Sequence, residues 1–174
     1  MISQTAEYAL RVVVFLGALE GANATTRQIA AATQVPEGYL AKILQNLGRA
    51  GLIRAQRGLH GGSVLAGDPG SISLFDVINA VNPLPRIRKC PLNLPSHGTN
   101  LCPLHKKLDD AMAVVEQTLR DCSLADLLKQ RDGSIPLGNL GVDAAAATRA
   151  AEAVFKVRKP VPLTVSAKSR RKEK

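Results

Sequence analysis

Residues 25–53 read TTRQIAAATQVPEGYLAKILQNLGRAGLI, and this stretch predicts two short helices joined by a tight turn. Thr25 and Gln28 have the spacing of a capping box, in which the threonine caps a backbone N–H and the glutamine reaches back. The first helix therefore begins after Thr25 and runs to about Thr33. A second helix follows over residues 37–50, so the stretch predicts a helix-turn-helix.

Local signals bound the second helix on both sides. Pro36 lies where proline is tolerated, because a backbone N–H is not needed in the first turn of a helix. Gly51 is expected to stop the helix, as glycine often does at a helix C-terminus. Apolar residues recur at helical spacing along one side, which predicts that this side is buried. The predicted buried stripe consists of Leu40, Ile43, Leu44 and Leu47.

A β-hairpin is predicted directly after the two helices. Residues 52–55 have the composition of a short strand, and residues 63–66 have that of a return strand. Between them the glycine-rich segment RGLHGG, residues 57–62, is typical of a hairpin tip. Two helices followed by such a hairpin make a winged helix-turn-helix. The predicted fold class is therefore mainly α with a small β-hairpin wing.

The helix-turn-helix and its wing carry residues suited to a DNA-binding surface. In this architecture the second helix enters the major groove, with its N-terminal side chains toward the base edges, and we expect the wing along the adjacent minor groove or phosphates. Basic residues dominate from Arg27 to Arg57, where only Glu37 is acidic. The alternative is a helical protein-interaction module with an ordinary hairpin. The predicted DNA contacts are Thr26, Glu37, Gly38, Tyr39, Lys42, Arg57, His60 and Gly61.

Four more helices are expected outside this pair. Apolar residues at helical spacing predict one over residues 3–20. Ser73 and Ser123 are placed to cap short helices, and Pro103 begins a long helix between them. The long helix carries an apolar stripe that a lone helix cannot bury, so we predict that it forms a homodimer interface. The predicted interface residues are Leu104, Leu108, Met112, Val115 and Leu119.

The net charge of +9 is concentrated near the C-terminus. Residues 156–174 hold eight Lys or Arg against Glu173, a net charge of +7, which leaves +2 for the rest of the chain. Beyond Arg131, Gly, Ala, Pro and basic residues dominate, and no pattern there can bury a core. Such a tail is expected to add non-specific DNA affinity.

The predicted organisation has three parts. A winged helix-turn-helix DNA-binding domain comes first. A Cys/His loop, the dimerisation helix and a short C-terminal helix follow, and a disordered basic tail comes last. Their limits are residues 1–82, 83–131 and 132–174.

Composition also bears on location and enzymatic activity. The chain has 174 residues and three cysteines, too few for a secreted disulfide scaffold, which favours a reducing compartment. No apolar run approaches the ~18 residues of a membrane span. The N-terminal segment contains Glu7 and Arg11 and lacks the early positive charge of a signal peptide. We expect a cytoplasmic protein without membrane association. No nucleophile–base pair, phosphate loop or paired acid site indicates an enzyme.

Residues 88–110 read RKCPLNLPSHGTNLCPLHKKLDD and contain two of the three cysteines and two of the three histidines. Cys102 precedes Pro103 at a predicted helix start, where the helix dipole favours the thiolate that binds metal. His105 is expected to project from the same face of that helix. The segment is therefore a candidate metal or redox site.

Three segments resemble, in order, the DNA-binding half of the IscR/NsrR family of bacterial winged-helix regulators. They are YALRVVVFLGAL, IAAATQVPEGYLAKILQNLGRAGLI and RGLHGGSVLA, at residues 8–19, 29–53 and 57–66. The resemblance covers about residues 1–130. It implies a homodimeric transcription factor, a repressor, in a family whose members often sense iron–sulfur status, nitric oxide or redox state. Ala41 falls where IscR places a base-reading glutamate, so no operator preference is carried over.

The resemblance also implies a set of ligands. The family places its cluster-binding cysteines in the loop before the dimer helix. The place of the middle cysteine falls at Ser96, next to His97. In the relatives NsrR and RsrR an acidic residue of the first helix contributes a ligand from the other subunit, and Glu7 occupies that place. The outer cysteines and the histidine of IscR are matched by Cys90, Cys102 and His105.

Three chemistries stay open for this loop. Iron–sulfur sites accept His in place of Cys, so a 2Fe–2S cluster would be held by Cys90, Cys102, His105 and the partner subunit's Glu7. Zinc would be held by Cys90, His97, Cys102 and His105. Alternatively, Cys90 and Cys102 form a reversible disulfide and no metal is bound. Loop position, cysteine spacing and Glu7 favour the cluster.

Overall fold

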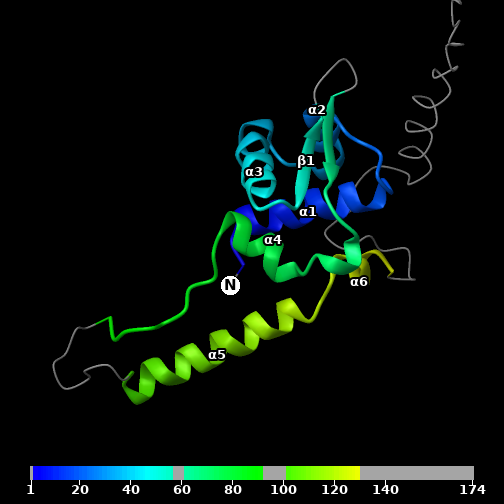
Figure 1. The fold of residues 1–174 in the computed structure, drawn as a ribbon. Helices are drawn as coiled ribbons and strands as arrows, with labels where there is room; N and C mark the ends of the chain where they lie inside the picture. The colour runs from blue at the N-terminus through cyan, green and yellow to red at the C-terminus, as the bar shows by residue number, and fades with distance from the viewer. Residues whose placement is uncertain (1, 57–60, 92–100, 130–174) are drawn as a thin grey trace, which may run out of the picture.

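The computed structural model describes residues 2–56, 61–91 and 101–129. Within them the chain is mainly helical, with one two-stranded antiparallel sheet, so the predicted fold class is confirmed (Figure 1). A short 3₁₀ helix, η1, was not predicted. The elements in order are α1 (Gln4–Ala18), α2 (Thr26–Thr33), α3 (Glu37–Arg49), β1 (Ile53–Gln56), β2 (Gly62–Leu65), η1 (Pro69–Ser71), α4 (Leu74–Val81), α5 (Pro103–Arg120) and α6 (Leu124–Leu128).

The helix-turn-helix forms from the predicted local signals. Thr25 caps α2, and both bonds of its capping box with Gln28 are present. Gln34 then adopts a left-handed conformation with φ 56°, which turns the chain toward α3. Pro36 is the N-cap of α3, and Gly51 follows its C-cap with φ 74°. Glycine adopts this positive φ at little steric cost, which explains why the helix ends there.

The wing is a β-hairpin that also pairs with a third segment. β1 and β2 are antiparallel, with Ile53 opposite Leu65 and Gln56 opposite Gly62. Ala24, just before α2, exchanges two backbone hydrogen bonds with Ser63, at 3.0 and 2.8 Å. Strand β2 of the wing is thereby fixed to the residue that precedes the helix-turn-helix. The predicted contacts Arg57 and His60 lie outside the described residues.

Helix α1 lies at the centre of the winged domain, between the α2, α3 and wing layer and the α4 and α6 layer (Figure 1). It is buried on most sides because its sequence is apolar on most sides, as expected for a central helix. Leu124 of α6 belongs to the same core, and Leu128 packs against Gly17 of α1. The buried residues of α1 are Ala6, Ala9, Leu10, Val12, Val13, Val14, Phe15, Leu16 and Gly17.

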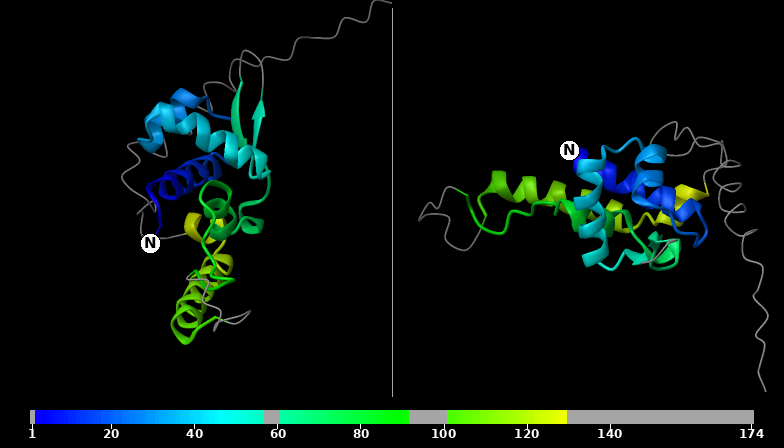
Figure 2. Two further views of the ribbon diagram at one scale, coloured as in Figure 1. Left: turned by 90° about the vertical axis from the view of Figure 1, so that its left-hand side faces the viewer. Right: turned by 90° about the horizontal axis from the view of Figure 1, so that it is seen from above.

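Helix α5 extends away from the winged domain, and none of its residues is fully buried (Figure 2). Its C-terminal end is anchored by backbone pairing between the caps of two other helices. Leu74 N–H donates to the Cys122 carbonyl at 3.0 Å, and Leu124 N–H donates to the Ile72 carbonyl at 2.8 Å. The opposite end of α5, which begins after Cys102, therefore lies far from the core.

No helix in the described part of the chain is long and apolar enough to cross a membrane. The predicted tail, residues 132–174, lies outside the described residues.

Candidate DNA interface and Cys/His site

Helix α3 has one buried and one exposed face. Leu40, Ile43 and Leu47 are buried in the core, whereas the predicted contact residues at the start of the helix point to solvent. Thr26, at the start of α2, is also exposed, and Gly61, at the tip of the hairpin, is half-buried. The helix thus presents a polar, solvent-facing surface composed of Glu37, Gly38, Tyr39 and Lys42.

Tyr39 is oriented by a contact from α1. Its ring meets the ring of Tyr8 edge to face, with centroids 6.2 Å apart and planes at 72°. Tyr8 accepts a hydrogen bond from Gln4 at 3.0 Å, and the Arg11 guanidinium lies 5.8 Å from the centre of the Tyr8 ring. Tyr39 nevertheless keeps 56% of its surface exposed, so it is available to a ligand on the outer face of α3.

Two glycines of α3 have no packing reason to be glycine. A Cβ added at Gly38 or at Gly48 would meet nothing within 4 Å. Glycine destabilises a helix relative to alanine, so its use in open space needs another reason. At Gly38, which lies at the predicted DNA-facing end of α3, this reason is consistent with close approach of the helix backbone to DNA.

At the outer end of α5 the structure brings together three of the predicted ligands. His105 Nδ1 lies 3.2 Å from Cys102 Sγ and 3.8 Å from Cys90 Sγ. Cys102 is the N-cap residue of α5, but its side chain makes no capping hydrogen bond, which leaves the thiol directed to other partners. Cys90 is buried, although it belongs to a segment with neither helix nor strand. All three cysteines of the chain are present as thiols.

These donors fit a soft or borderline metal in kind, since two thiols and an imidazole nitrogen are the ligands that zinc and iron–sulfur clusters use. Over residues 2–56, 61–91 and 101–129, no group of three or more Cys, His, Asp or Glu side chains is arranged so that it could hold a metal ion. The three donors therefore do not form a metal site by themselves within the described part of one chain. Ser96 and the alternative ligand His97 lie outside the described residues.

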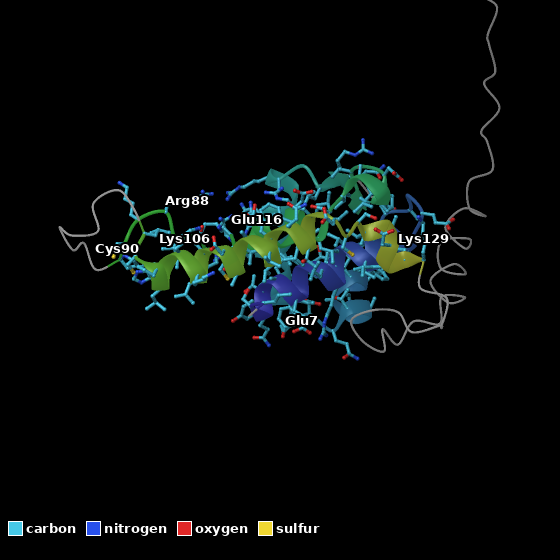
Figure 3. The ribbon with its side chains drawn as sticks, turned by 90° about the horizontal axis from the view of Figure 1, so that it is seen from below. Glu7, Arg88, Cys90, Lys106, Glu116 and Lys129 are labelled. Atoms are coloured by element: carbon cyan, nitrogen blue, oxygen red, sulfur yellow. The ribbon has the colours of Figure 1, made fainter. Side chains whose placement is uncertain are left out.

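Glu7 does not join this group within one chain. Figure 3 shows Cys90 at the outer end of α5 and Glu7 well apart from it, beside the winged domain. Glu7 is half-buried in the first turn of α1 and pairs with Arg11 at 2.5 Å. Arg11 also donates to the Thr33 carbonyl at the end of α2, at 3.5 Å. Any ligation by Glu7 at a Cys/His site therefore requires a second copy of the chain.

Exposed basic residues flank Cys90 and His105 in the sequence. Arg88 and Lys106 lie near Cys90 in Figure 3, and Lys89 and Lys107 are their exposed neighbours in sequence. Positive charge and a helix N-terminus both favour thiolate over thiol. The environment therefore suits either a metal–thiolate centre or reactive thiols.

A residue that the sequence patterns did not single out connects this segment to α5. Arg86 donates two parallel hydrogen bonds to Asp109, from Nε to Oδ1 at 2.7 Å and from Nη2 to Oδ2 at 2.8 Å. The Asp109 carboxylate beside Arg86 has its pKa held well below the usual range by these bonds, and the pKa of Arg86 is raised in return. No local spacing rule relates the two residues, so only the fold reveals the pair.

The apolar stripe of α5 is only partly covered by its own chain. Leu104, Leu108 and Val115 have 64%, 48% and 45% of their surface exposed, and Met112 is half-buried. Leu119 packs against the core of its own chain, which makes it the least available of the predicted interface residues. Val114, outside the predicted stripe, is 67% exposed.

Comparison with known proteins shows what kind of protein the chain is similar to. The family model Rrf2, described as "Iron-dependent Transcriptional regulator", matches residues 2–130. The HTH-type transcriptional regulator NsrR of Geobacillus kaustophilus is 37% identical over 131 residues, covering 72% of this chain and 87% of that protein. A putative HTH-type regulator of Mycobacterium tuberculosis is also 37% identical, covering 72% of this chain and 80% of that protein.

Solved structures share the fold. The global cysteine regulator CymR of B. subtilis matches with a TM-score of 0.59 at 25% identity, covering 73% of this chain and 95% of that one. The oxidized form of Staphylococcus aureus CymR matches with a TM-score of 0.60 at 27% identity, covering 76% and 98%. IscR of T. potens has a TM-score of 0.60 at 24% identity, covering 74% and 86%.

The winged helix-turn-helix fold and the similarity to HTH-type transcriptional regulators define the class of protein, which is a DNA-binding transcriptional regulator and not an enzyme. The chain belongs to the Rrf2 family.

Proposed function

We propose that the chain is a homodimeric cytoplasmic repressor whose DNA affinity responds to the state of the Cys90, Cys102 and His105 site. The observation that carries the proposal is the convergence of these donors, with His105 Nδ1 3.2 and 3.8 Å from the two sulfurs. They converge at the end of the long helix of a DNA-binding regulator whose family is described as iron-dependent. A regulator with no sensor would not need two thiols and an imidazole at one point.

DNA recognition is assigned to the outer face of α3 and to the wing. Tyr39 and Lys42 are exposed on α3 and would face the major groove, and Gly38 would permit close approach of the backbone. Arg57 and His60 of the wing would contact phosphates or the minor groove. Thr26, Glu37 and Gly61 complete the proposed surface.

The dimer is assigned to α5. An exposed stripe of large apolar residues on a helix that extends from the domain is costly in water, and a second copy of the same helix would cover it. Two-fold symmetry would then match a roughly palindromic operator, with half-sites a helical turn or multiples of one apart. The proposed interface uses Leu104, Leu108, Val115 and the flanking Val114, with Met112 and Leu119 at its edge.

For the occupant of the site we favour a 2Fe–2S cluster. Cys90, Cys102 and His105 would hold it together with the partner subunit's Glu7, which accounts for the missing fourth donor. A bound cluster would make the charge and shape of the site depend on iron supply and on oxidants. Exposed cations around Cys90 would offset the negative charge of the thiolates.

The chain offers a physical route from Glu7 to the DNA surface. Glu7 and Tyr8 are adjacent in α1, and Tyr8 contacts Tyr39 of α3. If Glu7 turns to a metal, Arg11 loses its carboxylate partner beside the Thr33 carbonyl, at the end of α2. The α1 and α3 helices would then be held together differently in the two states.

One experiment separates the three chemistries. The full chain is purified without oxygen, and its visible spectrum, iron, zinc and sulfide content and DNA affinity are measured before and after oxidation. A brown parent protein supports the cluster if its visible absorption is lost in the Cys102→Ala variant and is reduced in the Glu7→Ala variant. A colourless protein with one zinc per chain indicates a zinc site instead, provided that the zinc content is unchanged in the Glu7→Ala variant.

Metal-free protein whose thiol count drops by two on mild oxidation indicates the disulfide instead. Colourless, metal-free protein whose DNA binding is unchanged by Cys90→Ala would show that the site is no sensor.

A further inference from the structure

The segment from Leu84 to Cys90 has no helix or strand to hold it, yet Cys90 is buried. An extended backbone outside a sheet needs other partners for its polar groups. Here Ile87 N–H donates to Asp109 Oδ1 at 2.9 Å, next to the two bonds that Arg86 makes to the same carboxylate. Arg86 also donates from Nη1 to Glu116 Oε2 at 3.0 Å. One arginine and one backbone N–H thus attach the segment to α5.

The attachment lies on the face of α5 that presents His105. Asp109 is one helical turn after His105, and Glu116 is two further turns along, so the three side chains project from one side of the helix. The carboxylate bonds are shielded from solvent, because the side chains of Arg86, Asp109 and Glu116 are only 23%, 15% and 20% exposed. Bidentate arginine–carboxylate pairs constrain geometry more than single contacts do.

One of the two carboxylates, that of Glu116, is also held by Arg120 of the same helix. Arg120 donates to Glu116 from Nε at 3.1 Å and from Nη2 at 2.9 Å. Its guanidinium lies 3.6 Å from the centre of the Phe75 ring of α4. Arg86 therefore attaches the segment, through Glu116 and Arg120, to the end of α5 that contacts α4.

We propose that Arg86 is the positioning residue of the Cys/His site: bonded to Asp109 and Glu116, it holds Cys90 next to Cys102 and His105 before any metal arrives. The inference rests on the proposed function for its biological meaning, but the positioning is a property of the metal-free chain and is tested there.

The test measures how close Arg86 keeps the two thiols. The metal-free full chain carrying Cys122→Ala is equilibrated with reduced and oxidised glutathione, which takes up the two electrons and two protons of the Cys90 and Cys102 thiols as they form a disulfide. The equilibrium gives the effective concentration of one thiol at the other. Arg86→Gln and Asp109→Asn are compared with the parent chain.

The matched control is Asp110→Asn. Asp110 is the next carboxylate along α5, it is 51% exposed, and it accepts hydrogen bonds from Lys106 at 3.2 and 3.3 Å. We expect Arg86→Gln and Asp109→Asn each to lower the effective concentration about tenfold, the scale of a lost charge-assisted hydrogen bond. Asp110→Asn should leave it unchanged. Equal values in all four proteins would overturn the proposal.

Two measurements guard against a general loss of structure. Arg86→Lys, which keeps the charge but not the paired geometry, should recover part of the effective concentration. Hydrogen exchange of the Ile87 amide should accelerate in Arg86→Gln while amides of α1 stay protected. If α1 exchanges equally fast, Arg86 stabilises the whole fold and the positioning role is wrong.

A cobalt(II) titration of the same proteins separates this proposal from the proposed function. A parent chain that binds no cobalt through thiolates, but whose disulfide depends on Arg86, would contradict the metal site and support the positioning role.

Discussion

The ring of Tyr8 in α1 meets the ring of Tyr39 in α3 edge to face, with 6.2 Å between their centroids. The central helix of the core therefore touches the proposed DNA surface directly. Tyr39 keeps 56% of its surface exposed in spite of this contact. The pair connects the packing of the domain to its proposed activity, and it defines the first prediction.

Tyr39→Ala should weaken operator binding by about 1–3 kcal/mol, the usual range for a base-contacting side chain. The melting temperature should change little, because the side chain is more than half exposed. Gln45→Ala, also exposed on α3 but further from its N-terminus, serves as the control and should bind normally. Fluorescence anisotropy with labelled operator measures both. If the two variants bind alike, Tyr39 is a packing residue.

Arg57→Ala should weaken binding to every DNA sequence by a similar factor. A phosphate contact carries no sequence information, so its loss lowers the slope of log affinity against log salt by about one. Affinities for operator and random duplex at several salt concentrations check this. An unchanged slope would exclude Arg57 from the phosphate contacts.

Gly62→Ala should destabilise the domain by about 1–3 kcal/mol, as overpacking does. A Cβ at Gly62 would lie 2.5 Å from the Ala24 carbonyl oxygen, and this backbone atom is held by the wing pairing. Gly48→Ala, in open space on α3, should instead stabilise by about 0.5–1 kcal/mol. Thermal unfolding followed by circular dichroism distinguishes the two. An unchanged melting temperature in Gly62→Ala would mean that the backbone of the wing shifts away from Ala24 at little cost in free energy.

Leu108→Asp or Val115→Asp should convert the proposed dimer into a monomer with poor operator binding. Each places a charge in the apolar stripe of α5, where burial against a partner would leave the charge unpaired. Gln117→Asp, an exposed polar position on the same helix, should remain dimeric. Analytical ultracentrifugation at micromolar concentration is the measurement. A parent chain that sediments as a monomer contradicts the dimer.

Asp109→Asn should alter how stability depends on pH. The bonds from Arg86 hold the pKa of folded Asp109 well below the ordinary value near 4 expected in the unfolded chain. Between these values the unfolded state binds more protons, so the stabilisation is complete above the ordinary value and is lost as pH falls toward the folded one. The difference in the free energy of unfolding between the parent chain and Asp109→Asn should therefore become smaller at acid pH.

Urea unfolding at about pH 7, 5 and 3 checks this narrowing, with Asp110→Asn as the control. A gap that stays constant down to pH 3 would mean that Asp109 acts through something other than its charge.

Local patterns in the sequence determined the elements and their ends. The capping box of Thr25 and Gln28 and the stop at Gly51 depend on hydrogen bonds and steric limits within a few residues. These interactions are nearly independent of the rest of the chain, so the helix-turn-helix and the wing could be predicted before folding. Cys102 and His105 could be paired for the same reason, since three residues along a helix bring side chains to one face.

Contacts between distant segments were decided only by the tertiary structure. Ala24 pairs with Ser63, and Leu119 turns to the core of its own chain. Arg86 bonds to Asp109, 23 residues away in the sequence, and Cys90 lies 3.8 Å from His105. No periodicity or spacing in the sequence predicts these long-range contacts, because they depend on how the helices pack around α1. The sequence by itself therefore identified the candidate ligands, while the packing of the chain decided which of them lie close together.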